Sequence, residues 1–562
     1  MWTEPQLTIL QKVNRWVVCL SIKISEETLL ELNRFMDTDY IDKILNNLKE
    51  EEPNFANLQR GIDLLLKHLY SQSRIAVLFD VDMDGICSGS IIYDYIKCIS
   101  IAPLALINER KNHGITKNVI SECLVNKINL LICVDCASND INYLKILDSY
   151  SIDVLILDHH EVDNKKLFSV INPVLISASD GQYRNKNLSG AGVVYKFVKE
   201  LDSKIKSYDT NKYLEFAGIS IISDMCNMLE RENRWFVHQL LVETDKFSKF
   251  TSMFVEYGAV KNAFVFGCIP VVNSLIRLGF SQLAKNVFIA YSSSEIRRIY
   301  EIGLITREFQ EKSIKLLLDE IKHNKDVIFR DYGSLLFLNI SCFLKKENER
   351  LKASIGELGK KLNTELSYSS IISNFTGLLA SKFKEIYSKP TLVAYRINDD
   401  GEVRGSFRGN NQRINYKDIF NNCGVKSLGH QQAFGLVSNI AEYNEGIKLI
   451  IDELSKDTLA DSVYVLDCDI NKVNLRMIRD IALLNEFSGV GVKEIFVRLH
   501  FNTYDISIDN KEKYDIITIK NFEILNFNKN AKFNELRKVK KCLVEPTFDK
   551  CNDVGFKLIF KE

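Results

Sequence analysis

The sequence predicts an α/β protein built around a parallel sheet, and two observations support this prediction. Short apolar runs recur from residue 74 onward, and several of them end directly in an acidic residue. The stretches between these runs can form the helices that connect parallel strands. A chain of 562 residues is also too long for one core, so we expect several domains.

The chain divides into five predicted segments. Residues 1–72 have apolar positions at helical spacing, which indicates a helical lead-in to the sheet domain at 73–282. Residues 283–330 contain few helix breakers and predict a long helical connector. A second mixed α/β domain is expected at 331–458. Residues 459–562 alternate like strands, and this β-rich region is compatible with a small barrel of the oligonucleotide-binding type.

Four apolar runs predict the strands of the first sheet: RIAVLFD, APLALIN, NLLICVD and DVLILD, which begin at residues 74, 102, 129 and 153. In open parallel sheets the ligand site lies just beyond the carboxyl ends of the strands. Asp80, Asp135 and Asp158 each follow a predicted strand directly. We therefore expect their carboxylates to converge on one edge of the sheet.

Composition limits the class of protein. Lys plus Arg and Asp plus Glu are 73 each, so no global positive field attracts nucleic acid and any basic groove must be local. The 13 cysteines follow no repeating framework, which is typical of a reducing compartment. The N-terminus lacks the apolar core of a signal peptide, and no apolar run reaches about eighteen residues. We expect a cytoplasmic protein with no membrane partner.

The segment Asp80–Gly85, DVDMDG, places three acids in alternation at the end of a predicted strand. Carboxylates this close repel one another, and a divalent cation removes that repulsion, so the segment indicates a manganese or magnesium site. Gly85 suits the tight turn that lets the backbone approach. The motif alone would fit a solvated acidic turn equally well.

Three further elements favour the metal site. Asp135 follows a second strand, and His159 and His160 follow Asp158 at the end of another. Histidine supplies a borderline nitrogen ligand, and the second imidazole can face a substrate phosphate. Asp224 follows the apolar run FAGISIIS and can reach back to the same cluster. These elements together outweigh the acidic-turn interpretation.

The elements DVDMDG, VDC, LDHH and ISD, in this order, resemble the motifs of the DHH phosphoesterase superfamily, and in particular of its RecJ-like exonucleases. The superfamily's pyrophosphatase branch has a histidine where this sequence has Leu78, which favours the nuclease branch. The resemblance implies two bound divalent ions, Mn²⁺ or Mg²⁺, and a contact from His160 to the scissile phosphate. The implied metal-binding and supporting residues are Asp80, Asp82, Asp84, Asp135, His159 and Asp224.

The same resemblance implies residues that bind the substrate. RGSFR from residue 404 and GHQQAFG from residue 429 resemble elements of the DHH-associated domain, where arginine forks and exposed glycine backbone suit phosphate. The sequence departs from the family at Leu428, which replaces a glycine, and before Gly114, where another glycine is missing. The implied substrate-binding residues are Arg110, His160, Asn273, Arg277, Arg404, Ser406, Arg408, Gly429 and His430.

The resemblance implies a metal-dependent exonuclease that degrades single-stranded DNA from the 5′ end, in DNA repair or recombination, with Asp135 shared by two ions that activate water. Single-stranded DNA is the expected partner, and a helicase or single-strand-binding protein is a further one. Two alternatives stay open: a phosphodiesterase for short oligoribonucleotides or cyclic dinucleotides, and a non-catalytic replication or repair binding protein. Because Asp224 is the last implied ligand, we expect the region after residue 459 to hold only distal nucleotides.

Overall fold

A computed structural model describes most of the chain, in two compact units. Unit 1 comprises residues 1–106, 114–269 and 463–562, and unit 2 comprises residues 107–113 and 270–462. Described are residues 24–32, 36, 38–45, 48–109, 112–162, 170–177, 181–206, 208–242, 247–255, 260–345, 347–396, 401–411, 414–456, 464–501, 506–510, 515–519, 522–526, 541–548 and 554–561. Within these residues every helix is either too short or too polar to cross a lipid bilayer.

Unit 1 contains the predicted parallel sheet, in the strand order β2-β1-β3-β4-β5. The pairs β1·β3, β3·β4 and β4·β5 are parallel, with Val77 opposite Ile132 and Cys133 opposite Ile156. Continuous apolar runs suit strands that are covered on both faces, and β1 and β3 are buried along their whole length. The strands are β1 Ile75–Phe79, β2 Leu104–Ile107, β3 Leu130–Val134, β4 Asp153–Leu157 and β5 Val170–Ile171.

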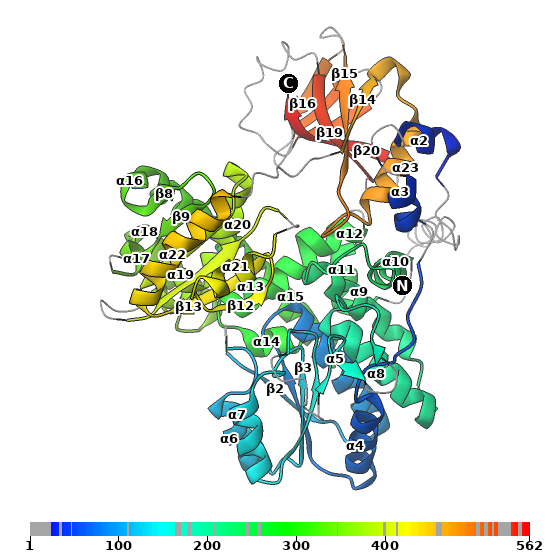
Figure 1. Ribbon diagram of the computed structural model, residues 1–562, viewed down its shortest axis with the longest axis vertical. Helices are drawn as coiled ribbons and strands as arrows, with labels where there is room; N and C mark the ends of the chain where they lie inside the picture. The colour runs from blue at the N-terminus through cyan, green and yellow to red at the C-terminus, as the bar shows by residue number, and fades with distance from the viewer. Residues whose placement is uncertain are drawn as a thin grey trace. The chain divides into compact units, whose positions relative to one another are not determined.

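Helices cover both faces of this sheet, as Figure 1 shows for α6 and α7 on one side and α4 and α8 on the other. On one face, Leu78, Leu131 and Ile156 share a core with residues of α6 and α7. On the opposite face, Gly89 lets α5 approach the ring of Phe79 closely. The helices are α4 Leu58–Tyr70, α5 Met83–Ile99, α6 Lys117–Val125, α7 Ile141–Ser149, α8 Gly190–Ile205 and α9 Leu214–Ser223.

Shorter elements complete this part of unit 1. A two-stranded ladder pairs β6 Ile176–Ser177 with β7 Gly181–Gln182. A 3₁₀ turn at Thr210–Tyr213 leads into α9. The remaining helices are α2 Glu26–Leu32, α3 Thr38–Leu45, α10 Arg231–Val242, α11 Lys249–Val255, α12 Val260–Ala263 and the π-helix Phe264–Cys268.

The C-terminal part of unit 1 is a seven-stranded sheet in the order β14-β15-β19-β20-β18-β17-β16. The pairs β14·β15 and β18·β20 are parallel, so the sheet is mixed. The predicted β-rich region is therefore confirmed, with seven strands where an oligonucleotide-binding barrel has five. Its elements are β14 Tyr464–Asp469, the 3₁₀ turn Ile470–Lys472, α23 Leu475–Asn485, β15 Ile495–His500, β16 Ile506–Asn510, β17 Asp515–Ile519, β18 Phe522–Asn526, β19 Lys541–Phe548 and β20 Val554–Lys561.

Unit 2 contains a six-stranded mixed sheet in the order β12-β13-β11-β10-β9-β8, which confirms the second mixed α/β region. Within the segment of the predicted connector lies α15, a helix of 31 residues at Ser293–His323. The strands are β8 Phe329–Asp331, β9 Leu336–Asn339, β10 Thr391–Arg396, β11 Val403–Arg408, β12 Ser427–His430 and β13 Ala433–Ser438. The other helices are α13 Ile269–Arg277, α14 Ser281–Lys285, α16 Lys325–Ile328, α17 Ser341–Lys345, α18 Glu349–Leu362, α19 Tyr368–Asn374, α20 Thr376–Tyr387, α21 Tyr416–Asn422 and α22 Ile440–Ser455.

Candidate metal centre

The loop after β1 brings the first carboxylates to the start of α5. Asp80 and Asp84 are buried, and Asp82 is the N-cap of the helix, where its Oδ1 accepts a hydrogen bond from the Gly85 backbone N–H at 2.9 Å. A side chain at Gly85 would place a Cβ 2.6 Å from the backbone carbonyl of Asp80. The motif therefore requires a glycine at position 85, because the Asp80 backbone leaves no room for a side chain there.

Asp84 is held rigidly by donors from two other helices. The backbone N–H groups of Gly190 and Ala191, at the start of α8, donate to its two carboxylate oxygens at 2.8 Å each. The Ser220 hydroxyl of α9 donates to Oδ1 at 2.7 Å. Backbone amides at a helix N-terminus favour negative charge, so the Gly-rich start of α8 fixes this carboxylate. Ser220 was not predicted, since its apolar run carries no signal for this role.

Asp135 lies at the centre of the cluster. It follows β3 with a φ of +58°, and its side chain is 2% exposed. It belongs to three groups whose ligand atoms lie within 4.8 Å of one another: with Asp84 and His159, with Asp158 and His160, and with Asp80 and Asp82. Its Oδ1 is buried and makes no hydrogen bond to a described residue. A buried carboxylate oxygen in this position fits a metal ligand.

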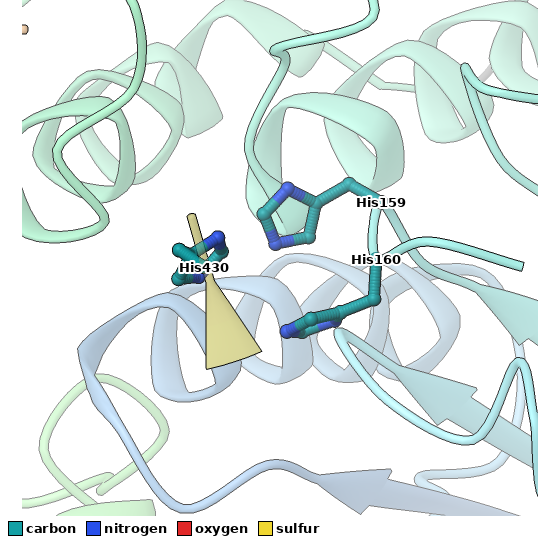
Figure 2. Close-up of side chains that lie close together, drawn as sticks. All are labelled: His159, His160 and His430. Carbon is teal, nitrogen blue, oxygen red and sulfur yellow. The ribbon is translucent and has the colours of Figure 1, made fainter. Parts of the chain in front are cut away.

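His159 and His160 project from consecutive positions of the loop after β4, as Figure 2 shows. Their ring centroids are 4.7 Å apart. His159 Nε2 lies 3.2 Å from Asp135 Oδ1, 3.6 Å from Asp224 Oδ2 and 3.9 Å from an oxygen of Asp84. One imidazole nitrogen thus faces carboxylates from three separate segments, which is the donor set expected of a mixed oxygen and nitrogen metal site.

His160 is oriented by Asp158 rather than by the acid cluster. Its Nδ1 lies 2.8 Å from Asp158 Oδ1, which also accepts the backbone N–H groups of His159 and His160, and Ser138 N–H donates to Oδ2. Although burial opposes both charges, the pair holds the pKa of Asp158 below its usual range and raises the pKa of His160 to about 10. The sequence predicts Asp158 at this edge of the sheet but assigns it no role, although its place before two histidines is a usable signal.

Asp224 reaches the cluster from a helix. The apolar run that precedes it forms α9, and Asp224 is the C-cap of that helix. Because α9 packs against α5 and α8 in the structure, its end lies beside the carboxyl edge of the sheet. The structure therefore brings together the predicted residues of unit 1: Asp80, Asp82, Asp84, Asp135, His159, His160 and Asp224.

Three carboxylates of this cluster, those of Asp82, Asp84 and Asp135, resist ionisation when no cation is bound. Burial, followed by repulsion from neighbouring acids, raises the pKa of Asp82 and of Asp84 to about 6. The same causes raise the pKa of Asp135 well above its usual range. Buried like charges of this kind fit a site for hard divalent cations, which restore the ionised state by supplying the missing positive charge.

Mn²⁺ should stabilise the folded chain more strongly at neutral than at acidic pH. An acid whose folded pKa lies above its ordinary value binds its proton more tightly when folded, so the metal-free chain loses stability as pH rises from about 4 to about 6. Metal binding requires deprotonated ligands, so the affinity for Mn²⁺ increases over the same pH range. Melting midpoints with Mn²⁺ or chelator at about pH 5 and pH 7.5 measure the difference. Equal midpoint shifts at both pH values would contradict the assigned ligands.

The predicted substrate-binding residues other than His160 and Arg110 all lie in unit 2. Arg110 lies outside the described residues. Asn273 and Arg277 are on α13, where the Arg277 carbonyl accepts a hydrogen bond from Asn374 Nδ2 at 2.8 Å. Gly429, with a φ of +129°, and His430 are on β12.

Strand β11 carries the remaining predicted substrate residues on one face, at alternate positions. Arg404 is exposed and pairs with Glu402 at 2.9 Å. The buried Ser406 hydroxyl lies 2.8 Å from the Thr376 hydroxyl. Arg408 is half-buried, and burial lowers its pKa to about 10. A guanidinium that is partly shielded from water binds an anion more strongly than a fully exposed one does, so Arg408 is suited to phosphate.

The chain is similar in sequence to known proteins. Residues 74–221 match the profile of the DHH family, N-terminal domain. YorK, a provisionally assigned single-strand DNA-specific exonuclease from the SPbeta prophage of Bacillus subtilis strain 168, is 24% identical over 75% of this chain and 72% of its own length. The single-stranded-DNA-specific exonuclease RecJ of the same strain is 20% identical over 78% of this chain and 53% of its own length.

Solved structures share the fold. RecJ from Thermus thermophilus in complex with Mn²⁺ has a TM-score of 0.69 at 14% identity, and the match covers 99% of this chain and 78% of that protein. The same protein in complex with Mg²⁺ has a TM-score of 0.63 at 13% identity, over 99% of this chain and 77% of that protein. The α/β architecture inferred from the apolar runs is thus confirmed by structural similarity at a low level of sequence identity.

Proposed function

We propose that this chain, whose residues 74–221 match the N-terminal domain of the DHH family, is a metal-dependent exonuclease that hydrolyses single-stranded DNA from the 5′ end. The observation that carries this proposal is the convergence of carboxylates and His159 on the buried Asp135. The relatives named as single-strand DNA-specific exonucleases, including YorK and RecJ, support the substrate. A helicase or a single-strand-binding protein stays a predicted partner.

The ligands that we assign are Asp82, Asp84, Asp135, His159 and Asp224, with Asp80 as a supporting acid. We assign two ions, Mn²⁺ or Mg²⁺, with Asp135 shared between them, because Asp135 belongs to several groups of candidate ligands. Such ions lower the pKa of a bound water and neutralise charge on the phosphoryl oxygens. The rigid donors to Asp84 would keep its carboxylate in place while metal and substrate exchange.

His160 is the residue that we assign to the scissile phosphate. Asp158 holds its Nδ1 and stabilises the imidazolium, so the ring presents a positive charge at neutral pH. Its other ring nitrogen, Nε2, would donate to a phosphoryl oxygen and stabilise the negative charge that develops during hydrolysis. The buried Asp158 would act through His160, as the carboxylate that sets the orientation of this ring.

Digestion of end-labelled oligonucleotides tests the proposal. We expect Mn²⁺ or Mg²⁺ to support progressive shortening of single-stranded DNA, with a label at the 3′ end remaining on the shrinking fragments, and a chelator to prevent it. Retention of a 5′ label on those fragments would contradict the polarity. Cleavage restricted to dinucleotide-length substrates would indicate the short-oligonucleotide phosphodiesterase, and tight binding of DNA without cleavage would indicate the binding protein.

Replacing Arg404 or Arg408 by Ala should raise the KM for single-stranded DNA, because both guanidinium groups are assigned to phosphate. We expect about a tenfold increase at low salt, since one charge-assisted contact contributes roughly 1.5–3 kcal/mol. Added salt should weaken the wild type more than either variant. Arg350→Ala, at an exposed position of α18, is the matched control. An unchanged KM in both variants would remove β11 from the substrate site.

A further inference from the structure

A turn of the C-terminal region contacts the segment that follows Asp224. The turn comprises residues Ser488–Val492, between α23 and β15, and the segment comprises Met225–Glu230, between α9 and α10. The Met228 backbone N–H donates to the Val490 carbonyl at 2.7 Å. This hydrogen bond therefore joins two segments of unit 1 that are far apart in the sequence. One of them directly follows Asp224, an assigned metal ligand.

The glycines of this turn make the approach possible. At Gly491, which has a φ of +84°, a Cβ would lie 2.3 Å from Asn227 Oδ1 and 3.0 Å from Leu229 Cγ. At Gly489 a Cβ would lie 3.0 Å from Met228 Cγ. A larger residue at Gly491 must therefore displace the turn or the Asn227 side chain, whose Oδ1 accepts a hydrogen bond from the Leu229 backbone N–H, and it must also adopt an unfavourable backbone conformation.

The turn is itself anchored from two sides. Lys261, which follows the start of α12, donates through Nζ to the carbonyls of Asn485 at 2.8 Å and Ser488 at 3.2 Å. Burial lowers the pKa of Lys261. The Tyr40 hydroxyl donates to the Gly491 carbonyl at 3.3 Å. These contacts leave the turn little freedom to move.

Helix α10 holds the opposite side of the segment. Asn233 Nδ2 donates to the Asn227 carbonyl at 2.9 Å, and the buried Arg234 donates through Nη1 to the Met228 carbonyl at 2.6 Å. Only Met225 and Cys226 lie between Asp224 and the residues held by these hydrogen bonds. Met225 has a φ of +52°. The chain therefore reverses sharply between the metal centre and the point where the turn docks.

We propose that the Ser488–Val492 turn is a positioning element for Asp224. It fixes the segment against α10 and thereby sets where the Asp224 carboxylate lies relative to His159 Nε2, 3.6 Å away. The proposal rests on the proposed function, because it concerns the same metal centre. Gly491 and Lys261 are positioning residues that act through Asp224, and the C-terminal region contributes to metal binding as well as to any hold on distal nucleotides.

Mn²⁺ affinity measured by calorimetry on the full chain, without nucleic acid, tests the proposal. We expect Gly491→Ala to weaken binding by about 10-fold to 100-fold, the loss typical of residues that orient metal ligands. Gly333→Ala is the matched control, since Gly333 has a φ of +83° and a Cβ added there would meet no atom of the described residues within 4 Å. This control carries the same backbone strain without the crowding, and we expect its affinity to equal that of the wild type.

Lys261→Met provides a second variant should Gly491→Ala fail to fold. It keeps the side-chain volume but removes the hydrogen bonds that anchor the turn, and we expect a several-fold loss of Mn²⁺ affinity. If a folded Gly491→Ala or Lys261→Met protein bound Mn²⁺ with wild-type affinity, the positioning role would be overturned. This holds also if the variant raised the KM for long DNA. Absence of Mn²⁺ binding in the wild type would instead overturn the proposed function.

Discussion

Asp135→Asn is expected to abolish hydrolysis while leaving the chain folded. Asn tolerates the left-handed backbone that residue 135 adopts, with a φ of +58°, so the substitution adds little strain. It removes the carboxylate common to the groups of the acid cluster. Loss of a shared metal ligand should cost several kcal/mol of transition-state stabilisation, which corresponds to a decrease in kcat of about a thousandfold.

The fold of this variant should be at least as stable as the wild type in the absence of metal. Burial and neighbouring acids raise the pKa of Asp135, so its ionised form opposes folding at neutral pH, and Asn removes that cost. Asp153→Asn is the matched control, because Asp153 begins β4 at the opposite edge of the same sheet. Single-turnover rates at saturating Mn²⁺ measure the effect. Retention of more than about a tenth of wild-type activity would contradict a shared ligand.

Glu232→Ala should cause the largest loss of stability. Glu232 and Lys196 are fully buried and lie 2.9 Å apart. The Glu232 carboxylate also accepts the Tyr183 hydroxyl at 2.8 Å, Asn185 Nδ2 at 3.1 Å and the Glu51 backbone N–H at 3.0 Å. Removing Glu232 leaves the buried Lys196 ammonium with a single carboxylate partner among the described residues, Glu50 at 3.3 Å, and leaves several donors unmatched. We expect a decrease of about 3–5 kcal/mol in the free energy of unfolding.

Denaturant unfolding monitored by tryptophan fluorescence measures this decrease, because Trp235 lies on the same helix as Glu232. Glu230→Ala is the control. Its carboxylate contacts Asn187 at the protein surface at 3.3 Å, so we expect a change below about 1 kcal/mol. Similar transition midpoints for Glu232→Ala and Glu230→Ala would show that the buried pair contributes little to stability.

Much of the fold follows from local pattern in the sequence. The runs at residues 74, 129 and 153 are continuous apolar stretches, and each forms a buried parallel strand that ends next to an acid. In parallel sheets, ligand sites lie beyond the carboxyl ends of the strands. Because Asp80 and Asp135 directly follow their strands, the sequence predicts that the two carboxylates lie close together. In the structure, the parallel pairing of β1 with β3 is enough to bring these two acids together.

Other contacts of the site depend on tertiary packing that no local pattern encodes. Ser220 donates to Asp84 because α9 packs on α5. The Gly-rich start of α8 likewise contributes to the site by donating a backbone hydrogen bond to the Asp84 carboxylate. The C-terminal region was expected to act solely on distal nucleotides, since the last assigned ligand is Asp224. The hydrogen bond from Met228 to Val490 joins that region to the segment that follows Asp224, a contact that no local pattern in the sequence predicts.

Anomalous diffraction from crystals of the full chain grown with Mn²⁺ would locate the metal ions. We expect two anomalous peaks, each within about 2.5 Å of an Asp135 carboxylate oxygen, with His159 and Asp224 among the remaining ligands. These peaks should disappear in crystals of Asp135→Asn. Manganese bound elsewhere in the chain, or no peak beside Asp135 in the wild type, would contradict the assignment of this cluster as the catalytic metal centre.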